Sequence, residues 1–152
     1  MNIFITGASG FVGSHLIEAL SEDESIDKIF ALYRHKEQIA FLPKVIPVIG
    51  DLDTLPQLEQ YQSVDIFIHL AGYFKNESKK LCERINLQGT KNAIKFCKDN
   101  DIKNFLFYST INVDLKTKGC YATSKLAAEQ EVKNSGLEYM ILRPSLVYDK
   151  NH

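Results

Sequence analysis

The chain has 152 residues, a length that suggests one domain, and it is 45% hydrophobic and 24% charged, as in ordinary globular proteins. Its formal net charge of −1 argues against a nucleic-acid-binding surface. No apolar run is long enough to span a membrane, and the first residues read as a strand rather than as a signal peptide. We therefore expect a cytoplasmic protein without nucleic-acid or membrane partners.

The cysteines and histidines show no metal-ligand spacing. Cys82, Cys97 and Cys120 are odd in number, and the four histidines are scattered along the chain. We expect reduced thiols, as in a cytoplasmic protein, and no metal site.

Short apolar runs alternate with stretches at helical spacing. The predicted strands are residues 3–6, 29–33, 45–49, 64–70, 104–109 and 138–143, and the predicted helices are residues 14–20, 77–99 and 120–134. Pro47 indicates an edge strand, and Gly136 fits a helix C-terminus. The alternation predicts an α/β fold over residues 1–152, a doubly wound parallel sheet (Rossmann fold) with strand order 3-2-1-4-5-6. In such sheets ligands bind beyond the strand carboxyl ends, here between the first and fourth strands.

The first strand runs directly into a glycine turn, residues 7–13, with GxxGxxG spacing. Gly7 permits a tight turn, Gly10 lets the backbone approach a pyrophosphate, and Gly13 lets the helix pack closely on the strand. The following helix N-terminus presents free N–H groups to phosphates. A glycine-rich turn without a ligand is the alternative, but the position between a first strand and a first helix favours a dinucleotide.

Residues after the next strands select the cofactor. Arg34 stands where an NAD-binding protein carries a carboxylate, so it favours the 2′-phosphate of NADP; a solvated basic loop is the alternative. Asp51 and Leu52 follow the third strand and would contact adenine, unless Asp51 only caps a turn. Ala71 and Gly72 follow the fourth strand and would let the backbone run against the ribose and nicotinamide, or form a plain turn.

A second group of residues points to proton transfer. Tyr121 and Lys125 lie four residues apart on a predicted helix and so share one face. A neighbouring ammonium would lower the pKa of the phenol and make it a general acid or base. Ser109 or Thr110, at the end of the fifth strand, could bind the same substrate oxygen. The spacing also occurs by chance, but its position after a glycine turn favours a functional role.

Together these residues resemble the short-chain dehydrogenase/reductase superfamily, in its extended branch of NAD(P)-dependent epimerases, dehydratases and reductases. Five segments match in order along nearly the whole chain: TGASGFVG at 6–13, HLAG at 69–72, NLQGT at 86–90, YATSK at 121–125 and LRPSLVYD at 142–149.

The resemblance implies roles for individual residues. Tyr121 would be the catalytic acid/base, Lys125 its pKa-lowering and ribose-binding partner, and Thr110 the hydroxyl position, with Ser109 the less favoured candidate. Pro144 would lie near the nicotinamide amide, and Asn86 would be structural or close to the cofactor. The predicted cofactor-binding residues are Gly7, Gly10, Phe11, Val12, Gly13, Arg34, Asp51, Leu52, Leu70, Ala71, Gly72, Asn86, Tyr121, Lys125 and Pro144.

Two features depart from the family pattern. Asp149 replaces the glycine that usually follows Val-Tyr, and the sequence ends at His152, before the smaller lobe with which relatives bind the substrate. We expect the sixth strand to be an exposed edge.

Three functions compete. The first is an oxidoreductase or epimerase/dehydratase, or the N-terminal part of one, that acts on a small molecule with NADP (favoured) or NAD. The second is a non-catalytic, cofactor-binding regulatory module. The third is a fragment that folds without function. By resemblance alone we expect a homodimer through helices 77–99 and 120–134. The substrate, and the choice between reductase and epimerase, are not encoded in any motif found here.

Overall fold

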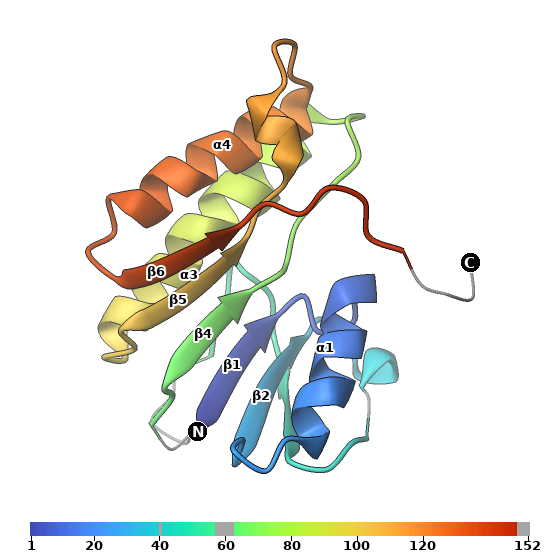
Figure 1. Ribbon diagram of the computed structural model, residues 1–152, viewed down its shortest axis with the longest axis vertical. Coiled ribbons are helices and arrows are strands. Elements are labelled where there is room, and N and C mark those ends of the chain that lie inside the picture. The colour runs from blue at the N-terminus through green and yellow to red at the C-terminus, as the bar shows by residue number, and fades with distance from the viewer. Residues whose placement is uncertain (40, 57–62, 149–152) are drawn as a thin grey trace.

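The computed structural model describes residues 1–39, 41–56 and 63–148. Its centre is a six-stranded, all-parallel sheet with the order β3-β2-β1-β4-β5-β6 (Figure 1). This order and the α/β class confirm the predicted Rossmann fold. The strands are β1 (Asn2–Thr6), β2 (Lys28–Tyr33), β3 (Val45–Ile49), β4 (Ile66–His69), β5 (Asn104–Tyr108) and β6 (Glu138–Leu142). The helices are α1 (Phe11–Glu22), η1 (Lys36–Gln38), α2 (Lys79–Leu81), η3 (Cys82–Gln88), α3 (Gly89–Asp99), η4 (Ile111–Asp114) and α4 (Cys120–Lys133).

The two faces of the sheet carry different side chains. Phe4 pairs in register with Phe30 and Phe67, and Phe67 pairs with Phe105, so phenylalanines form a row across four strands. The stacked rings of Phe4 and Phe67 have centroids 5.1 Å apart. Ile3, one residue away on β1, belongs to the aliphatic cluster of the opposite face, as the two-residue period of a strand requires.

Helices cover both faces. Ala93 and Phe96 of α3 and Val132 of α4 join the aromatic cluster, whereas Ile17 of α1 joins the aliphatic one. Figure 1 shows α1 against β1 and β2, and α3 and α4 along β5 and β6. Burial on both faces explains why the central strands read as continuous apolar runs.

The predicted helix of residues 77–99 is corrected by the structure. It begins at Lys79, because the Ser78 side chain accepts a hydrogen bond from the Leu81 N–H and caps the first turn. Its second segment, η3, is a π-helix. The Thr90 hydroxyl donates to the Asn86 carbonyl at 2.6 Å, and this side-chain bond competes with the regular backbone ladder. A wider turn therefore separates α2 from α3.

The other predicted elements are confirmed with small changes at their ends; the largest is at α1, which begins at Phe11 rather than Ser14. Gly136 takes a φ of +78° just after α4. β3 and β6 are the edge strands of the described sheet. Met140 of β6 is 59% exposed, in agreement with the exposed edge expected from the sequence. Asp149 lies outside the described residues.

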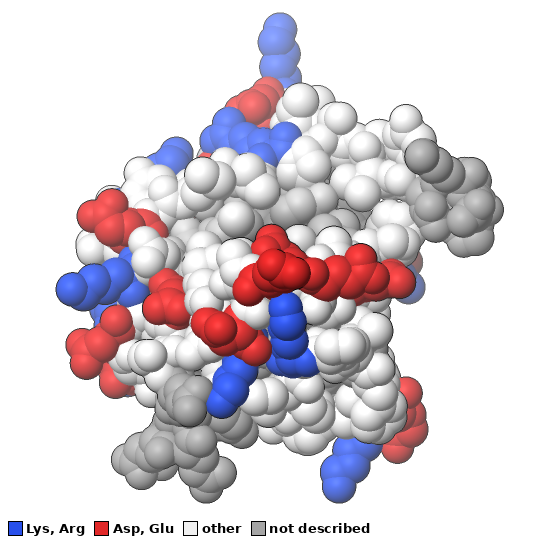
Figure 2. Space-filling model, turned by 60° about the horizontal axis from the view of Figure 1, so that its bottom comes forward, with Lys and Arg blue, Asp and Glu red and all other residues white. Residues whose placement is uncertain are grey.

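Acidic and basic side chains are mixed over the end of the molecule shown in Figure 2, where a short acidic band is flanked by basic side chains. The charges on this face are thus mixed in sign. Among the described residues, no helix is both long and apolar enough to cross a membrane.

Candidate functional site

A cavity of about 620 Å³ opens at the carboxyl ends of the strands, where β1 lies between β2 and β4. This is the reversal point at which doubly wound sheets bind ligands, and the volume suits a small-molecule site. Predicted residues that line it are Gly7, Gly10, Arg34, Asp51, Leu52, Leu70, Ala71 and Gly72.

The glycine turn forms one wall through backbone geometry. Gly7 has a φ of +76°, and a Cβ there would lie 2.6 Å from the Ala71 nitrogen. A Cβ on Gly13 would lie 2.1 Å from the Gly7 carbonyl oxygen, so α1 can pack against the turn only without that atom. Gly10 is the N-cap of α1 and supplies no side-chain cap. The backbone thus reaches the cavity directly, beside the helix N-terminus.

Asp51 both caps a turn and lines the cavity. Its Oδ1 accepts hydrogen bonds from the Asp53 N–H at 2.9 Å and from the Thr54 N–H and hydroxyl at 2.8 and 2.9 Å. Burial alone would raise the pKa of Asp51, but these hydrogen bonds outweigh it and lower the pKa. The turn-capping alternative is therefore correct in this structure, and it leaves the position at the cavity wall unchanged.

Several wall residues were not predicted from the sequence. Arg84 of η3 reaches across to Asp53, with its Nε 3.0 Å from the carboxylate Oδ2. Tyr73, Phe74 and Lys75, in the loop after β4, also line the cavity. Their position directly after the HLAG segment was the available signal. Arg84 could not be found because its neighbour Asp53 is distant in the sequence.

A series of buried hydrogen bonds, centred on His69, holds the glycine turn in place. The fully buried His69 ring contacts the Thr6 hydroxyl at 2.7 Å and the Thr90 hydroxyl at 3.1 Å through its two nitrogens. The Thr6 hydroxyl also accepts from the Ala71 N–H at 3.4 Å. Burial, with a smaller contribution from the charge of Lys125, lowers the pKa of His69 to about 3. His69 is therefore neutral and structural, linking β1, β4 and α3.

The predicted Tyr121–Lys125 pair has an unexpected electrostatic state. Lys125 is 3% exposed, donates to the Tyr108 carbonyl at 2.6 Å and lies 4.0 Å from the centre of the Phe107 ring. Burial lowers the pKa of Lys125 to about 7. Burial also raises the pKa of Tyr121, against the opposing effect of a hydrogen bond with Thr110. The expected lowering of the phenol pKa by Lys125 is therefore wrong in this structure, because the burial of Tyr121 is the largest effect and the opposing one comes from Thr110 rather than from Lys125.

The two candidate hydroxyls after β5 have different partners. The Ser109 hydroxyl donates to Glu129 Oε1 at 2.6 Å, whereas Thr110 is hydrogen-bonded to Tyr121. Glu129 is fully buried and also accepts from the Arg143 guanidinium at 2.6 and 2.9 Å. Ser109 is thus held in a structural network, and Thr110 is the hydroxyl beside the phenol.

Asn86 connects the cavity loop to α4. Its amide brackets Tyr73, accepting from the Tyr73 N–H at 2.7 Å and donating to the Tyr73 carbonyl at 2.9 Å, and it donates to the Ser124 hydroxyl at 2.9 Å. This arrangement agrees with the structural alternative for Asn86. Pro144 accepts from the Ile111 N–H at 3.0 Å, which fixes the segment after β6 beside η4.

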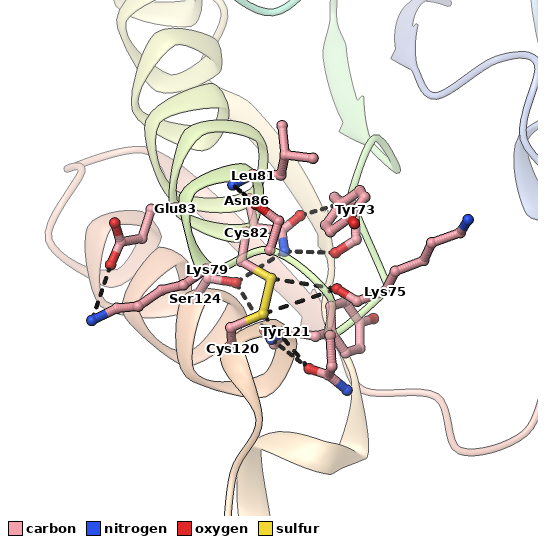
Figure 3. The surroundings of a disulfide bond; sticks show 12 residues. Tyr73, Lys75, Lys79, Leu81, Cys82, Glu83, Asn86, Cys120, Tyr121 and Ser124 are labelled. Carbon is pink, nitrogen blue, oxygen red and sulfur yellow. Dashed lines mark hydrogen bonds and ion pairs between the residues drawn. A yellow bond between two sulfur atoms is a disulfide. The ribbon is translucent and has the colours of Figure 1, made fainter.

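The expectation of three reduced thiols is wrong for two of the cysteines. Cys82 and Cys120 form a disulfide, with Cα atoms 5.9 Å apart, within the usual range (Figure 3). Only Cys97 is free, and it is buried. The fold brings together residues 38 positions apart, which spacing alone does not reveal. In the described part of the chain, no three or more His, Cys, Asp or Glu side chains gather so that they could hold a metal ion.

The predicted site residues therefore fall into two groups. The cavity group contains Gly7, Gly10, Arg34, Asp51, Leu52 and residues 70–72 after β4, while Thr110, Tyr121 and Lys125 form a second group around the first half of α4. Phe11, Val12, Gly13, Asn86 and Pro144 are not among the lining residues. Tyr73 and Asn86 lie between the two groups and join them.

Comparisons with known proteins agree with this geometry. The profile of the family described as NAD(P)H-binding matches residues 7–152. Ceramide reductase of Caulobacter vibrioides is 29% identical over 96% of the chain and 46% of its own length. UDP-glucose 4-epimerase of Vibrio cholerae is 27% identical over 97% of the chain and 52% of its own length. The chain spans about half the length of these two relatives.

A solved structure extends the similarity to three dimensions. The Bordetella bronchiseptica enzyme WbmH, in complex with NAD+, has a TM-score of 0.80 and 25% identity, with 93% of this chain and 55% of that chain covered.

Proposed function

Since the chain belongs to the NAD(P)H-binding family, among the NAD-dependent epimerases and dehydratases of the extended short-chain dehydrogenase/reductase branch, we propose that its cavity binds NADP(H), in preference to NAD(H), for an oxidoreductase reaction. The observation that carries this proposal is the glycine turn at the β1/β4 reversal point. There a φ of +76° at Gly7 and the bare N-cap at Gly10 bring the backbone to the wall of a cavity of about 620 Å³.

The cavity residues fit a dinucleotide. Gly10 would lie against the pyrophosphate at the α1 N-terminus, and Leu52 and the carboxylate of Asp51 would contact the adenine. Arg34 would pair with the 2′-phosphate, which a cavity-lining guanidinium can bind through two hydrogen bonds. The backbone of Ala71 and Gly72 would lie against the nicotinamide ribose, on the side that leads towards α4.

The start of α4 would carry the proton chemistry. When bound, the nicotinamide would supply or accept the hydride. Tyr121 would give the proton to the substrate oxygen, or take it away, while Thr110 would hold that oxygen by a hydrogen bond. Lys125 would bind the ribose.

The protonation state of Tyr121 favours reduction of a carbonyl substrate over oxidation of an alcohol. Burial raises the pKa of Tyr121, so the phenol is protonated at neutral pH and is suited to donate to a carbonyl oxygen. NADP selection by Arg34 points the same way. An epimerase would need the same residue to act first as a base, which the raised pKa disfavours.

A fluorescence titration with NADPH and NADH in parallel tests the cofactor assignment. We expect saturable binding, tighter for NADPH, and a reversed preference in Arg34→Asp. Lys36→Asp is the matched control, since it makes the same charge change two residues away, outside the cavity lining, and it should keep the wild-type preference. Failure of both nucleotides to bind wild-type protein would refute the proposal.

Turnover separates the enzyme from a cofactor-sensing module. Tyr121→Phe should keep the NADPH affinity within about twofold but stop NADPH consumption with a panel of aldehydes and ketones. If wild type binds NADPH and consumes none with any carbonyl compound, the regulatory module becomes the better assignment. A homodimer through α3 and α4 is a further proposal, to be tested by sedimentation.

A further inference from the structure

The Cys82–Cys120 disulfide crosses between the helices that carry the two halves of the candidate site. Cys120 is the first residue of α4 and directly precedes Tyr121, while Cys82 begins η3, the segment that contains Asn86. Figure 3 shows the Cys82–Cys120 disulfide beside Tyr121 and Lys75. A covalent bond at this position fixes the start of the proposed catalytic helix to the wall of the cavity.

Both sulfur atoms pack on the same loop. The Cys82 Sγ lies 3.5 Å and the Cys120 Sγ 4.0 Å from the Lys75 carbonyl oxygen. Asn76, the next residue, accepts a hydrogen bond from the Tyr121 N–H at 3.0 Å. The loop therefore contacts the disulfide along its backbone and the proposed acid/base residue through a side chain.

The loop has little else to hold it in place. Phe74 is 73% exposed, and Lys75 and Asn76 are also exposed, so apolar burial contributes little. At one end Asn86 brackets Tyr73 by two hydrogen bonds. At the other end Asn76 accepts from the Tyr121 N–H of α4, and the Lys75 carbonyl packs on the disulfide that joins η3 to α4. Opening the disulfide removes the covalent bond between the two helices on which this end of the loop packs.

The two cysteine residues differ in exposure. Cys82 is fully buried, whereas Cys120 is partly exposed. An external thiolate can therefore attack Cys120, and the Cys82 sulfur is the leaving group. The bond is reachable by a reductant without unfolding of the core, unlike the buried thiol of Cys97.

We propose that the Cys82–Cys120 pair is a redox modification site that locks the 73–76 loop and the start of α4 when oxidised and releases both when reduced. A dithiol supplies the reaction: one thiolate attacks the Cys120 sulfur, the disulfide breaks, and Cys82 leaves as a thiolate. The second thiol resolves the mixed disulfide. Two electrons and two protons pass from the dithiol to the two cysteines. Under reducing conditions the pair opens, so the element responds to the redox state of its surroundings.

The consequence for the cavity rests on the proposed cofactor function. Tyr73, Phe74 and Lys75 line the cavity, so release of the loop lowers the fraction of molecules whose wall is in place. The apparent Kd for NADPH rises by the inverse of that fraction, to roughly tenfold if the loop is in place a tenth of the time.

The test compares the full chain before and after treatment with dithiothreitol. Titration of the denatured, untreated protein should find one thiol, that of Cys97, and titration after reduction should find three. Hydrogen exchange, measured without any nucleotide, should accelerate about tenfold on reduction in residues 72–76 and 119–125, but not in the glycine turn at 7–13. NADPH titration should show about tenfold weaker binding.

Variants keep the result specific. Cys82→Ser and Cys120→Ser should each resemble the reduced protein and ignore the reductant, whereas Cys97→Ala should keep the full response. Three thiols in the untreated protein, or exchange in 72–76 and 119–125 that is unchanged by reduction, would overturn the proposal. Accelerated exchange together with no NADPH binding in either state would support the redox lock and refute the cofactor function instead.

Discussion

The glycine turn and the start of α4 build their parts of the site by different physical means. At the turn, Gly7 and Gly13 act through the absence of a side chain, and backbone atoms form the surface. On α4, Lys125 and Glu129 act through buried charge: Lys125 needs the Tyr108 carbonyl at the end of β5, and Glu129 needs Ser109 and Arg143, the residues that follow β5 and β6. The turn should therefore respond to added volume and be insensitive to pH, whereas α4 should respond to lost charge and to pH. Four experiments separate these responses.

The largest effect is expected at the glycine turn. Gly13→Ala places a Cβ 2.1 Å from the Gly7 carbonyl oxygen, so α1 or the turn must move, at a cost of about 3 kcal/mol or more. Gly10→Ala is the matched control, since its Cβ meets only the Gly7 oxygen at 3.2 Å and should cost about 1 kcal/mol. Urea unfolding measures both, and equal losses would contradict the geometric account.

A pH-dependent effect is expected at Lys125. Its pKa is about 7 when folded, against an ordinary value of 10.5, so between these values the unfolded chain binds more protons. The stability of wild type therefore rises with pH by up to about 1.4 kcal/mol per unit relative to Lys125→Met, which lacks the group. Urea unfolding at pH 7, 8 and 9 measures the difference, and a difference independent of pH would show that Lys125 keeps its ordinary pKa.

A smaller effect is expected at Glu129. Glu129→Gln removes the buried charge that binds Ser109 and Arg143, at a cost of about 2 kcal/mol at neutral pH. Burial alone would raise the pKa of Glu129, but these partners hold it below its usual value, so its contribution is lost as pH falls below about 4.5. Glu131→Gln breaks only an exposed pair with Lys91 and should change stability by less than about 0.5 kcal/mol. Equal losses in the two variants would exclude a buried network.

The smallest effect is expected at Gly136, where a glycine lies away from the site. Its φ is +78°, but an added Cβ would meet nothing within 4 Å, so Gly136→Ala introduces only conformational strain of about 1 kcal/mol. Gly136→Asn should lose about half as much, because asparagine tolerates this conformation. A loss at Gly136→Ala as large as that at Gly13→Ala would remove the distinction between strain and collision.

The fold could be predicted because it depends on local patterns. The apolar runs of β1 and β4, buried on both faces, and the glycine spacing after β1 together identify a doubly wound sheet and place its cavity. The choice of Thr110 over Ser109 could be favoured only by family resemblance. Its physical reason, the bond from Ser109 to Glu129, depends on side chains 20 residues apart.

The electrostatics of α4 could not be predicted, although part of the signal was present. Tyr121, Lys125 and Glu129 recur every four residues and so share one helix face. Such a stripe of charge usually faces solvent, and only the packing on β5 shows that Lys125 and Glu129 are buried. The disulfide likewise depends on a tertiary contact between segments that no local pattern connects.

The order of strands in the sheet has a consequence for how the chain folds as it is synthesised. Ile3 of β1 pairs with Ile29 on one side and with Ile66 on the other. The first three strands are complete by Ile49, so a three-stranded unit can form on the ribosome before β4 has been synthesised. In that unit, the edge of β1 that later pairs with β4 has no partner strand. During that interval β1 exposes an apolar edge that invites wrong pairing. The central strand of the finished protein is an edge strand of the nascent one.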